Sequence, residues 1–224
     1  LSVYTRLVLI LSAVLTFGGA ALLAVLEWNN PWTLGGMPVW QKLLASLFQS
    51  VTTRTAGFFT VSQAGLTEAG KAVSDMLMFV GGSSGSTAGG LKTVTLGVVV
   101  LAAVGTARGR SRASVFRHTI PQEKVSQAMT LFMLMLTLAF AGAALICACS
   151  GCSLSTALYE TVSALATVGL TAGLTATLTT LPKLLLIVFM FFGRVGIMTI
   201  SIGFLTASRA EDRFEYAPAR MLIG

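Results

Sequence analysis

Charged residues are scarce in this 224-residue chain. Asp, Glu, Lys and Arg together make up 10% of the sequence, against about 25% in an ordinary globular domain, while hydrophobic residues make up 54%. A chain this apolar cannot cover its surface with polar groups in water. The composition therefore excludes an ordinary soluble protein and predicts one whose solvent is a lipid bilayer.

The residues that usually carry enzyme or metal chemistry are also few. The one histidine, His118, lies in a basic segment far in sequence from the acidic residues, and the three cysteines group at positions 147, 149 and 152. An odd cysteine count without a second ligand cluster does not make a structural zinc site. We expect the protein not to be an enzyme and to have no cofactor, with a solvated histidine and with cysteines that are small apolar residues at a helix end.

The net charge is +7, but the basic residues are not arranged as a nucleic-acid surface. They lie mostly in the linker 107–124 and the tail 208–224, outside the apolar spans. An excess of Lys and Arg in such segments is typical of cytoplasmic loops. Arg6 precedes the first span, and residues 27–41 contain neither Lys nor Arg. We therefore expect cytoplasmic N- and C-termini and no nucleic-acid partner.

The apolar residues form a pattern that occurs twice. Residues 7–26 and 125–150 carry no charge, and each is long enough to cross about 30 Å of hydrocarbon as a helix. Each span is followed by a shorter amphipathic segment, 39–53 or 153–166, that is too short to cross. Residues 47–52 match residues 158–163 in chemical type, 111 positions later. The sequence therefore predicts a tandem duplication.

Each short segment leads into a Thr-x-Gly sequence. The first Thr-Gly segment is Thr55, Ala56, Gly57 and Phe58, and the second is Thr167, Val168, Gly169 and Leu170. A dehydrated alkali cation needs a cage of oxygen ligands, which backbone carbonyls supply without a formal charge. Such backbone is neither helix nor sheet, and glycine adopts it without steric strain. Two copies at equivalent positions indicate re-entrant pore loops, although surface helices in extracellular loops are the alternative.

A glycine-rich loop (81–92) interrupts the apolar stretch 73–104. Its candidate functional residues are Gly81, Gly82, Ser83, Ser84, Gly85, Ser86, Thr87, Ala88, Gly89, Gly90 and Lys92. Glycine lowers helix stability by about 1 kcal/mol per residue relative to Ala, so irregular backbone is expected here. The loop does not match a phosphate-binding sequence, because Leu91 separates Gly90 from Lys92 and no strand pattern precedes it. Lys92 either belongs to a gate or extends to the cytoplasmic interface.

Isolated charges in or beside the apolar segments are further candidates. Arg194 lies within the last span, where an arginine costs at least about 2.5–3.5 kcal/mol, so it is either functional or a structural arginine bound to helix carbonyls. Arg54 is expected to hold the pore loop rather than meet the ion. Asp75 is placed to pair with Lys71 one turn earlier. That pair and Glu160, near the outer mouth, are expected to be solvated.

These segments resemble, in order and over nearly the whole chain, the Trk/Ktr/HKT superfamily of potassium and sodium transporters. Residues 50–58 are similar to its third pore loop, and residues 79–92 to its glycine-rich intramembrane loop. Residues 162–170 resemble its fourth pore loop, and residues 192–196 the break in its last helix. The bacterial Ktr-type membrane subunit is the most similar branch.

The resemblance implies a pore surrounded by four such repeats, with a gate beneath the filter. Carried over by motif, the two Thr-Gly segments become the selectivity filter, residues 81–92 the gate, and Arg194 the partner of that gate. The resemblance also implies passive K⁺ uptake across a bacterial plasma membrane by a homodimer that binds a cytoplasmic nucleotide-sensing regulatory subunit. A Na⁺-selective or Na⁺/K⁺ transporter, and a non-conducting structural subunit, stay open as alternatives.

Only the third and fourth repeats of that family are present, which implies the C-terminal half of a transporter. Two pore loops cannot encircle an ion, so the N-terminal half is an expected partner beside membrane lipid. Leu1 in place of Met agrees with an internal fragment or a processed chain. We expect an all-α membrane protein of two membrane-pore-membrane repeats, 1–106 and 125–207, with re-entrant pore helices and extended filter strands.

Overall fold

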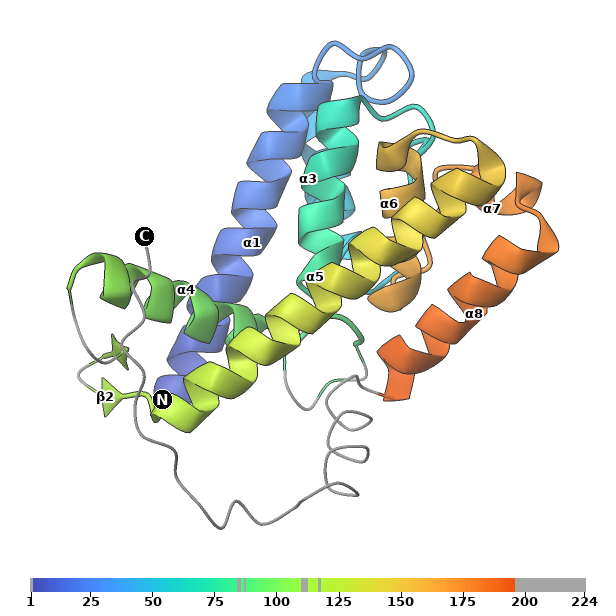
Figure 1. Ribbon diagram of the computed structural model, residues 1–224. Coiled ribbons are helices and arrows are strands. Elements are labelled where there is room, and N and C mark those ends of the chain that lie inside the picture. Colours follow the sequence, from blue (N-terminus) through green and yellow to red (C-terminus); the bar gives the residue numbers. More distant parts are fainter. Residues whose placement is uncertain (1, 84–85, 87, 110–112, 117, 196–224) are drawn as a thin grey trace.

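The chain folds into a mainly helical molecule (Figure 1). The computed structural model describes residues 2–83, 86, 88–109, 113–116 and 118–195. The helices are α1 (Val3–Glu27), α2 (Val39–Thr52), α3 (Glu68–Phe79), α4 (Thr93–Ala107), α5 (Gln122–Ser150), α6 (Leu154–Leu165), α7 (Leu174–Thr177) and α8 (Thr180–Val195). Of these, α1 and α5 are long and apolar enough to cross a membrane. The expected helical class is confirmed.

The element order follows the predicted duplication. A long helix (α1 or α5) packs against the short helix that follows it (α2 or α6), and a Thr-Gly segment leads from the short helix toward α3 or α8. In the first repeat the chain leaves the helix at Phe79 and resumes it at Thr93, so the glycine-rich loop separates α3 from α4. In the second repeat Gly193, Arg194 and Val195 are still helical, and the expected break at Gly196 lies outside the described residues.

Local sequence signals explain where several helices begin and end. The side chains of Ser2, Thr67 and Ser153 accept hydrogen bonds from backbone N–H groups three residues later, which caps α1, α3 and α6. Helix α5 ends at Gly151, whose φ of 60° is the left-handed conformation that commonly terminates helices. These caps fix the ends of the elements that surround the Thr-Gly segments.

Helix α6 is buried over its last two turns. It packs against α3, α5 and α8, and every residue from Tyr159 to Leu165 is buried. Ile146 of α5, Met78 of α3 and Phe189 of α8 belong to the same apolar cluster. Because α3, α5 and α8 all pack against α6, its direction is fixed. The second Thr-Gly segment, which follows α6, therefore begins at a fixed position.

Helix α2 is arranged the other way round, with its polar face inside. Its buried residues are Lys42, Ser46, Gln49, Ser50 and Thr52. Its apolar side chains Val39, Trp40, Leu43, Leu44, Phe48 and Val51 are exposed. Ser50 donates to the carbonyl of Thr16 in α1 at 2.8 Å, and Lys42 Nζ donates to the carbonyl of Trp28 at 2.7 Å. The outward apolar face requires lipid or another protein surface.

The Thr-Gly segments consist of turns and irregular backbone and form no β ladder in the described part of the chain. This agrees with the expected backbone that is neither helix nor sheet, and extended filter strands are not confirmed. The linker contains a short antiparallel hairpin of β1 (Ser114–Val115) and β2 (His118–Thr119). His118 is exposed in this hairpin. The hairpin, the start of α1 and the start of α5 lie at the same end of the molecule (Figure 1).

Candidate ion-filter site

The two Thr-Gly segments share an unusual backbone. In the first, φ is 73° at Thr55 and 80° at Gly57; in the second, φ is 56° at Thr167 and 89° at Gly169. Positive φ is rare for a β-branched residue and stores strain, which tends to cluster at functional sites. The same pattern occurs at equivalent positions, 112 residues apart. This repetition indicates that both segments require the same backbone conformation. The sequence predicted the glycines, but nothing in it signalled left-handed threonines.

The alternation of left-handed and ordinary residues orients the peptide groups. Only the threonine and the glycine of each segment have positive φ; the residues between and after them do not. When such conformations alternate, successive N–H groups turn toward one side of the chain and the carbonyl oxygens toward the other. Each segment can therefore present a row of carbonyl oxygens, the ligand type that a dehydrated alkali cation requires.

Hydroxyl groups in the last turn of α2 and α6 hold the end of each segment. Thr52 Oγ1 accepts a hydrogen bond from the N–H of Phe58 at 3.0 Å and donates to the carbonyl of the same residue. Ser163 Oγ donates to the carbonyl of Leu170 at 2.6 Å. Sequence reasoning missed this role, although the signal was present: Thr52 and Ser163 are the last matched pair of the duplication.

The two segments lie against one another. A methyl group placed on Gly57 would overlap the carbonyl oxygen of Val168 and would lie 3.8 Å from Gly169 Cα. Gly169 has open space at the same position. The first segment is half-open, with Ala56 and Phe58 exposed, whereas Val168 and Leu170 of the second are buried. One side of the first segment is thus left uncovered.

The short helices α2 and α6 are also joined to each other behind the Thr-Gly segments. Gln49 Nε2 of α2 donates to Gln63 Oε1 at 2.6 Å, and the hydroxyl of Tyr159 in α6 donates to the same oxygen at 2.7 Å. All three side chains are buried. This contact between residues 96 positions apart fixes α2 relative to α6, and it has no sequence signal.

The glycine-rich loop folds back on itself beside the Thr-Gly segments. Its base is closed by hydrogen bonds from Gly81 N to the Leu91 carbonyl at 2.9 Å and from Thr93 Oγ1 to the Gly81 carbonyl at 3.1 Å. Lys92 Nζ donates to the Ala88 carbonyl, so it turns onto the loop rather than away from it. The candidates Ser84, Gly85 and Thr87 lie outside the described residues.

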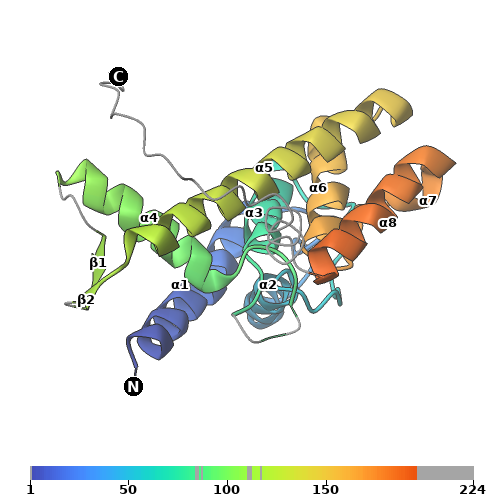
Figure 2. The same cartoon turned by 60° about the horizontal axis from the view of Figure 1, so that its bottom comes forward.

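The loop contacts the second Thr-Gly segment and faces the first across a cavity. The N–H of Gly89 donates to Thr167 Oγ1 at 3.0 Å. On the other side, a cavity of about 430 Å³ separates the loop from the first segment, and it is lined by Thr16, Val51, Arg54, Thr55, Gly82, Ser83, Ser86 and Ala88. In Figure 2 the end of α3 and the start of α4, which this loop joins, lie near the middle of the view.

The two arginine candidates have different surroundings. Arg54 reaches away from the Thr-Gly segment, donating to Thr93 Oγ1 at 3.1 Å and lying 3.5 Å from the hydroxyls of Ser12 and Thr16. This geometry agrees with the expected supporting role. Arg194 lies exposed in the last turn of α8, and its contact with the glycine-rich loop stays a prediction. The adjacent Gly193 packs against the Leu165 carbonyl and Thr167 Cγ2.

The expectation that Glu160 is solvated is wrong, because the side chain is 3% exposed. Its Oε1 accepts from Thr171 Oγ1 at 2.6 Å and from Ala172 N at 2.9 Å, and Oε2 accepts from Thr175 Oγ1 at 2.6 Å. A buried carboxylate is tolerated when donors surround it. Glu160 therefore anchors the chain that leaves the second Thr-Gly segment.

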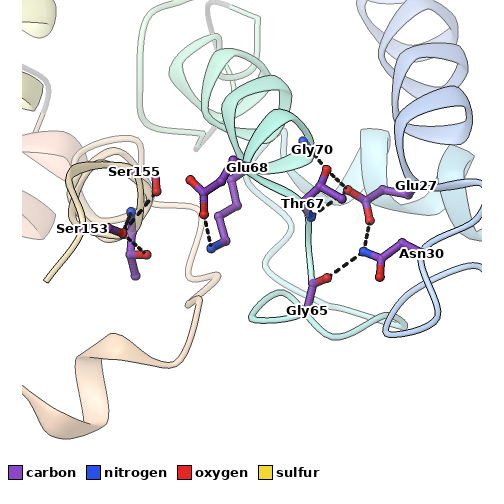
Figure 3. Close-up of polar contacts among 10 residues, drawn as sticks. Glu27, Asn30, Gly65, Thr67, Glu68, Gly70, Ser153 and Ser155 are labelled. Carbon is purple, nitrogen blue, oxygen red and sulfur yellow. Dashed lines mark hydrogen bonds and ion pairs between the residues drawn. The ribbon is translucent and has the colours of Figure 1, made fainter.

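Glu27, at the end of α1, is a second buried carboxylate that anchors a neighbouring segment (Figure 3). Its Oε1 accepts from the N–H and the hydroxyl of Thr67, at 2.9 and 2.6 Å, and Oε2 accepts from Asn30 and Thr33. Thr67 caps α3, and a methyl group on Gly70 in the first turn of α3 would overlap Glu27 Oε1. Glu27 thereby fixes the start of α3 against α1.

The expected pairing of Asp75 with Lys71 is also wrong. Lys71 Nζ lies 3.2 Å from Glu68 Oε1, an ion pair whose glutamate is largely exposed. Asp75 is buried, at 7% exposure, and its Oδ1 has no hydrogen-bond partner in the described part of the chain. The sequence spacing allowed either pair; the packing of α3 against α6 turns Asp75 inward.

Comparison with known proteins agrees with this architecture. Residues 2–215 match the TrkH family of cation transport proteins. The chain belongs to this family. It is 36% identical, over its whole length, to the potassium/sodium uptake protein NtpJ of Enterococcus hirae, and 35% identical over 95% of its length to the Ktr system potassium uptake protein B of Bacillus subtilis. These alignments cover 51% and 48% of the two relatives, so the chain spans about half their length.

The fold of the TrkH family is also seen in a solved structure. The crystal structure of the potassium transporter TrkH from Vibrio parahaemolyticus matches 88% of this chain and 43% of its own chain, with a TM-score of 0.67 and 23% identity. The chain is thus a membrane protein with the TrkH fold. The family is one of transport proteins, which agrees with the expectation that the chain is not an enzyme.

Proposed function

We propose that the chain supplies two of the pore-lining repeats of a K⁺ uptake transporter. One observation carries the proposal: two Thr-x-Gly segments have the same left-handed residues and lie against each other. Residues 55–58 and 167–170 form part of the selectivity filter, and their carbonyl oxygens replace the hydration shell of K⁺. The relatives named as potassium uptake proteins support K⁺ as the ion.

In this proposal the glycine-rich loop is the gate. It lies beside both filter segments, and irregular backbone at membrane depth persists only against protein or a water-filled cavity. Gly81, Gly82, Ser83, Ser86, Ala88, Gly89, Gly90 and Lys92 belong to it, together with Ser84, Gly85 and Thr87 by sequence, and Arg194 is its partner. The contact of Gly193 with the filter turn supports a position of Arg194 near that loop.

The N-terminal half of the same transporter completes the pore. Helix α6 is covered by α3 of the preceding repeat, whereas among the described helices α2 packs mainly against α1 and exposes its apolar face. A repeat that precedes the first would supply the missing inner helix at that face. It would also cover the exposed Ala56 and Phe58. The half-length alignments to the relatives agree with such a missing part.

The remaining features of the proposal concern location and assembly. The protein is a multi-pass component of a bacterial plasma membrane with cytoplasmic N- and C-termini, and it forms homodimers that bind a nucleotide-sensing regulatory subunit. The start of α1 and the linker hairpin lie at the same end of the molecule (Figure 1). This arrangement supports a single cytoplasmic face. Basic residues of the linker, such as Arg108 and Lys124, favour that side.

A Na⁺-conducting or mixed Na⁺/K⁺ transporter is the second candidate, since one relative is named a potassium/sodium uptake protein. Both candidates are tested by cation flux into vesicles that contain the complete transporter. The proposal expects K⁺ uptake faster than Na⁺ uptake. Equal or preferential Na⁺ uptake would support the second candidate, and the absence of any cation flux would leave a structural subunit.

A further inference from the structure

A hydrogen bond joins the glycine-rich loop to the second filter segment. The N–H of Gly89 donates to Thr167 Oγ1 at 3.0 Å, between residues 78 positions apart in sequence. Gly89 is buried, and a methyl group there would overlap Thr167 Oγ1 and come within 2.8 Å of the Ala166 carbonyl oxygen. The loop approaches this threonine so closely that only glycine fits.

The Thr167 hydroxyl has a chemistry that suits a second partner. A hydroxyl oxygen offers two lone pairs and can accept from an N–H or ligate a cation. Thr167 belongs to the segment whose carbonyls are the proposed ligands, and its methyl group packs toward Gly193. An N–H group that donates to this oxygen brings positive charge to the place where a cation would bind, so the two compete.

We propose that the Thr167 hydroxyl is shared between the loop and the conducted ion. The hydroxyl holds Gly89 when the adjacent end of the filter is empty, and it turns to the cation when that end is occupied. Ion occupancy therefore weakens docking of the loop, which makes the gate sensitive to K⁺ itself. This inference rests on the proposed function of the Thr-Gly segments and the loop.

The first repeat offers a matched comparison. Thr55 has the same left-handed conformation as Thr167 and also borders the loop, across the 430 Å³ cavity. It makes no hydrogen bond to the loop in the part of the chain that the structure describes. The base of the loop is tied separately, through Thr93 to Gly81 and to Arg54. Release of Gly89 would therefore free the loop near Thr167 while its base stays anchored.

The test uses the complete transporter in vesicles, with Cys147, Cys149 and Cys152 replaced by serine and with the substitution Ala88→Cys. Ala88 is half-buried beside Gly89, so its modification by a water-soluble methanethiosulfonate reports undocking. Replacing N-methylglucamine by K⁺ should raise the modification rate about threefold to tenfold, the shift expected for loss of one hydrogen bond. Thr167→Val should give the high rate in both solutions, and Thr167→Ser should keep the K⁺ dependence.

Thr55→Val is the control, because it removes the equivalent hydroxyl from the filter without breaking a bond to the loop. It should keep the K⁺ dependence, displaced at most to higher K⁺. Two results would overturn the coupling and leave the proposed function intact. One is that Thr55→Val and Thr167→Val lose the K⁺ dependence of the modification rate equally. The other is a modification rate that does not change with K⁺ when Thr55 and Thr167 are both present, although K⁺ flux is normal. Absence of K⁺ flux from the wild-type vesicles would overturn both.

Discussion

At the scale of single residues, the left-handed glycines differ in the space around them. Gly57 faces the Val168 carbonyl oxygen, while Gly169 has open space where a side chain would begin. Both have positive φ, which disfavours any L side chain. The two positions therefore separate backbone strain from steric overlap within one duplicated motif.

We predict that Gly57→Ala is more harmful than Gly169→Ala. Each substitution should destabilise the complete transporter by about 1–2 kcal/mol through the left-handed backbone. Gly57→Ala should add about 1–3 kcal/mol through overlap with the neighbouring segment. The measurement is the thermal unfolding midpoint in detergent, followed by the K⁺/Na⁺ flux ratio. Equal effects of the two substitutions would contradict the contact between the segments.

Residue-scale errors of the sequence analysis have a common physical cause. The sequence predicts that Glu160 and a Lys71–Asp75 pair are solvated, because spacing along the chain shows only local neighbours. The structure buries Glu160 and Asp75, since their neighbours come from the packing of elements distant in the chain. The glycines of the filter segments could be predicted from local backbone chemistry. The left-handed threonines could not, because strain of this kind is imposed by the surrounding fold.

At the scale of elements, the carboxylate of Glu27 joins α1 to the start of α3 through the N–H and the hydroxyl of Thr67 (Figure 3), and it also accepts from Asn30 and Thr33 in the loop after α1. Glu27→Gln should lower the free energy of unfolding by about 1.5–3 kcal/mol, because an amide cannot accept from all of these donors. Glu68→Gln is the matched control: its side chain is 71% exposed, and surface ion pairs contribute about 0–1 kcal/mol. Equal shifts in thermal unfolding would show that Glu27 does not hold these helices.

The proposed gate is also an element rather than one residue. Shortening the glycine-rich loop between Gly82 and Gly89, or Arg194→Ala, should raise K⁺ flux through the complete transporter without changing the K⁺/Na⁺ ratio. The proposed function assigns selectivity to the Thr-Gly segments, so the two properties should separate. Lower flux at normal expression, or an altered ratio, would assign the loop to the filter or to a structural role.

Element bounds were the most predictable part of the fold. The expected short helix at 39–53 is α2 (Val39–Thr52), and the interruption at 81–92 lies between the observed ends of α3 and α4. Runs of apolar residues, capping residues and glycine clusters determine helix bounds through local interactions, so these bounds can be predicted from the sequence. The linker hairpin and the bond from Tyr159 to Gln63 depend on residues brought together by folding, and they were not predicted.

At the scale of the whole molecule, the exposed apolar face of α2 tests the proposal that a preceding repeat completes the pore. A cysteine at Leu44, on its exposed apolar face, should react with a lipid-soluble maleimide when this chain is alone in a bilayer. It should be protected in the complete transporter, where a preceding repeat covers that face. Leu22→Cys on the exposed side of α1 is the control and should react in both. Reaction of the cysteine at position 44 in the complete transporter would contradict the missing neighbour.

The central claim is that the two Thr-Gly segments bind the conducted ion through their backbone. Anomalous diffraction from crystals of the complete transporter soaked in Tl⁺, a heavy substitute for K⁺, locates that ion directly. The account predicts an anomalous peak within ligand distance of carbonyl oxygens from residues 55–58 and 167–170. Anomalous peaks elsewhere in the pore, with none between these two segments, would contradict it.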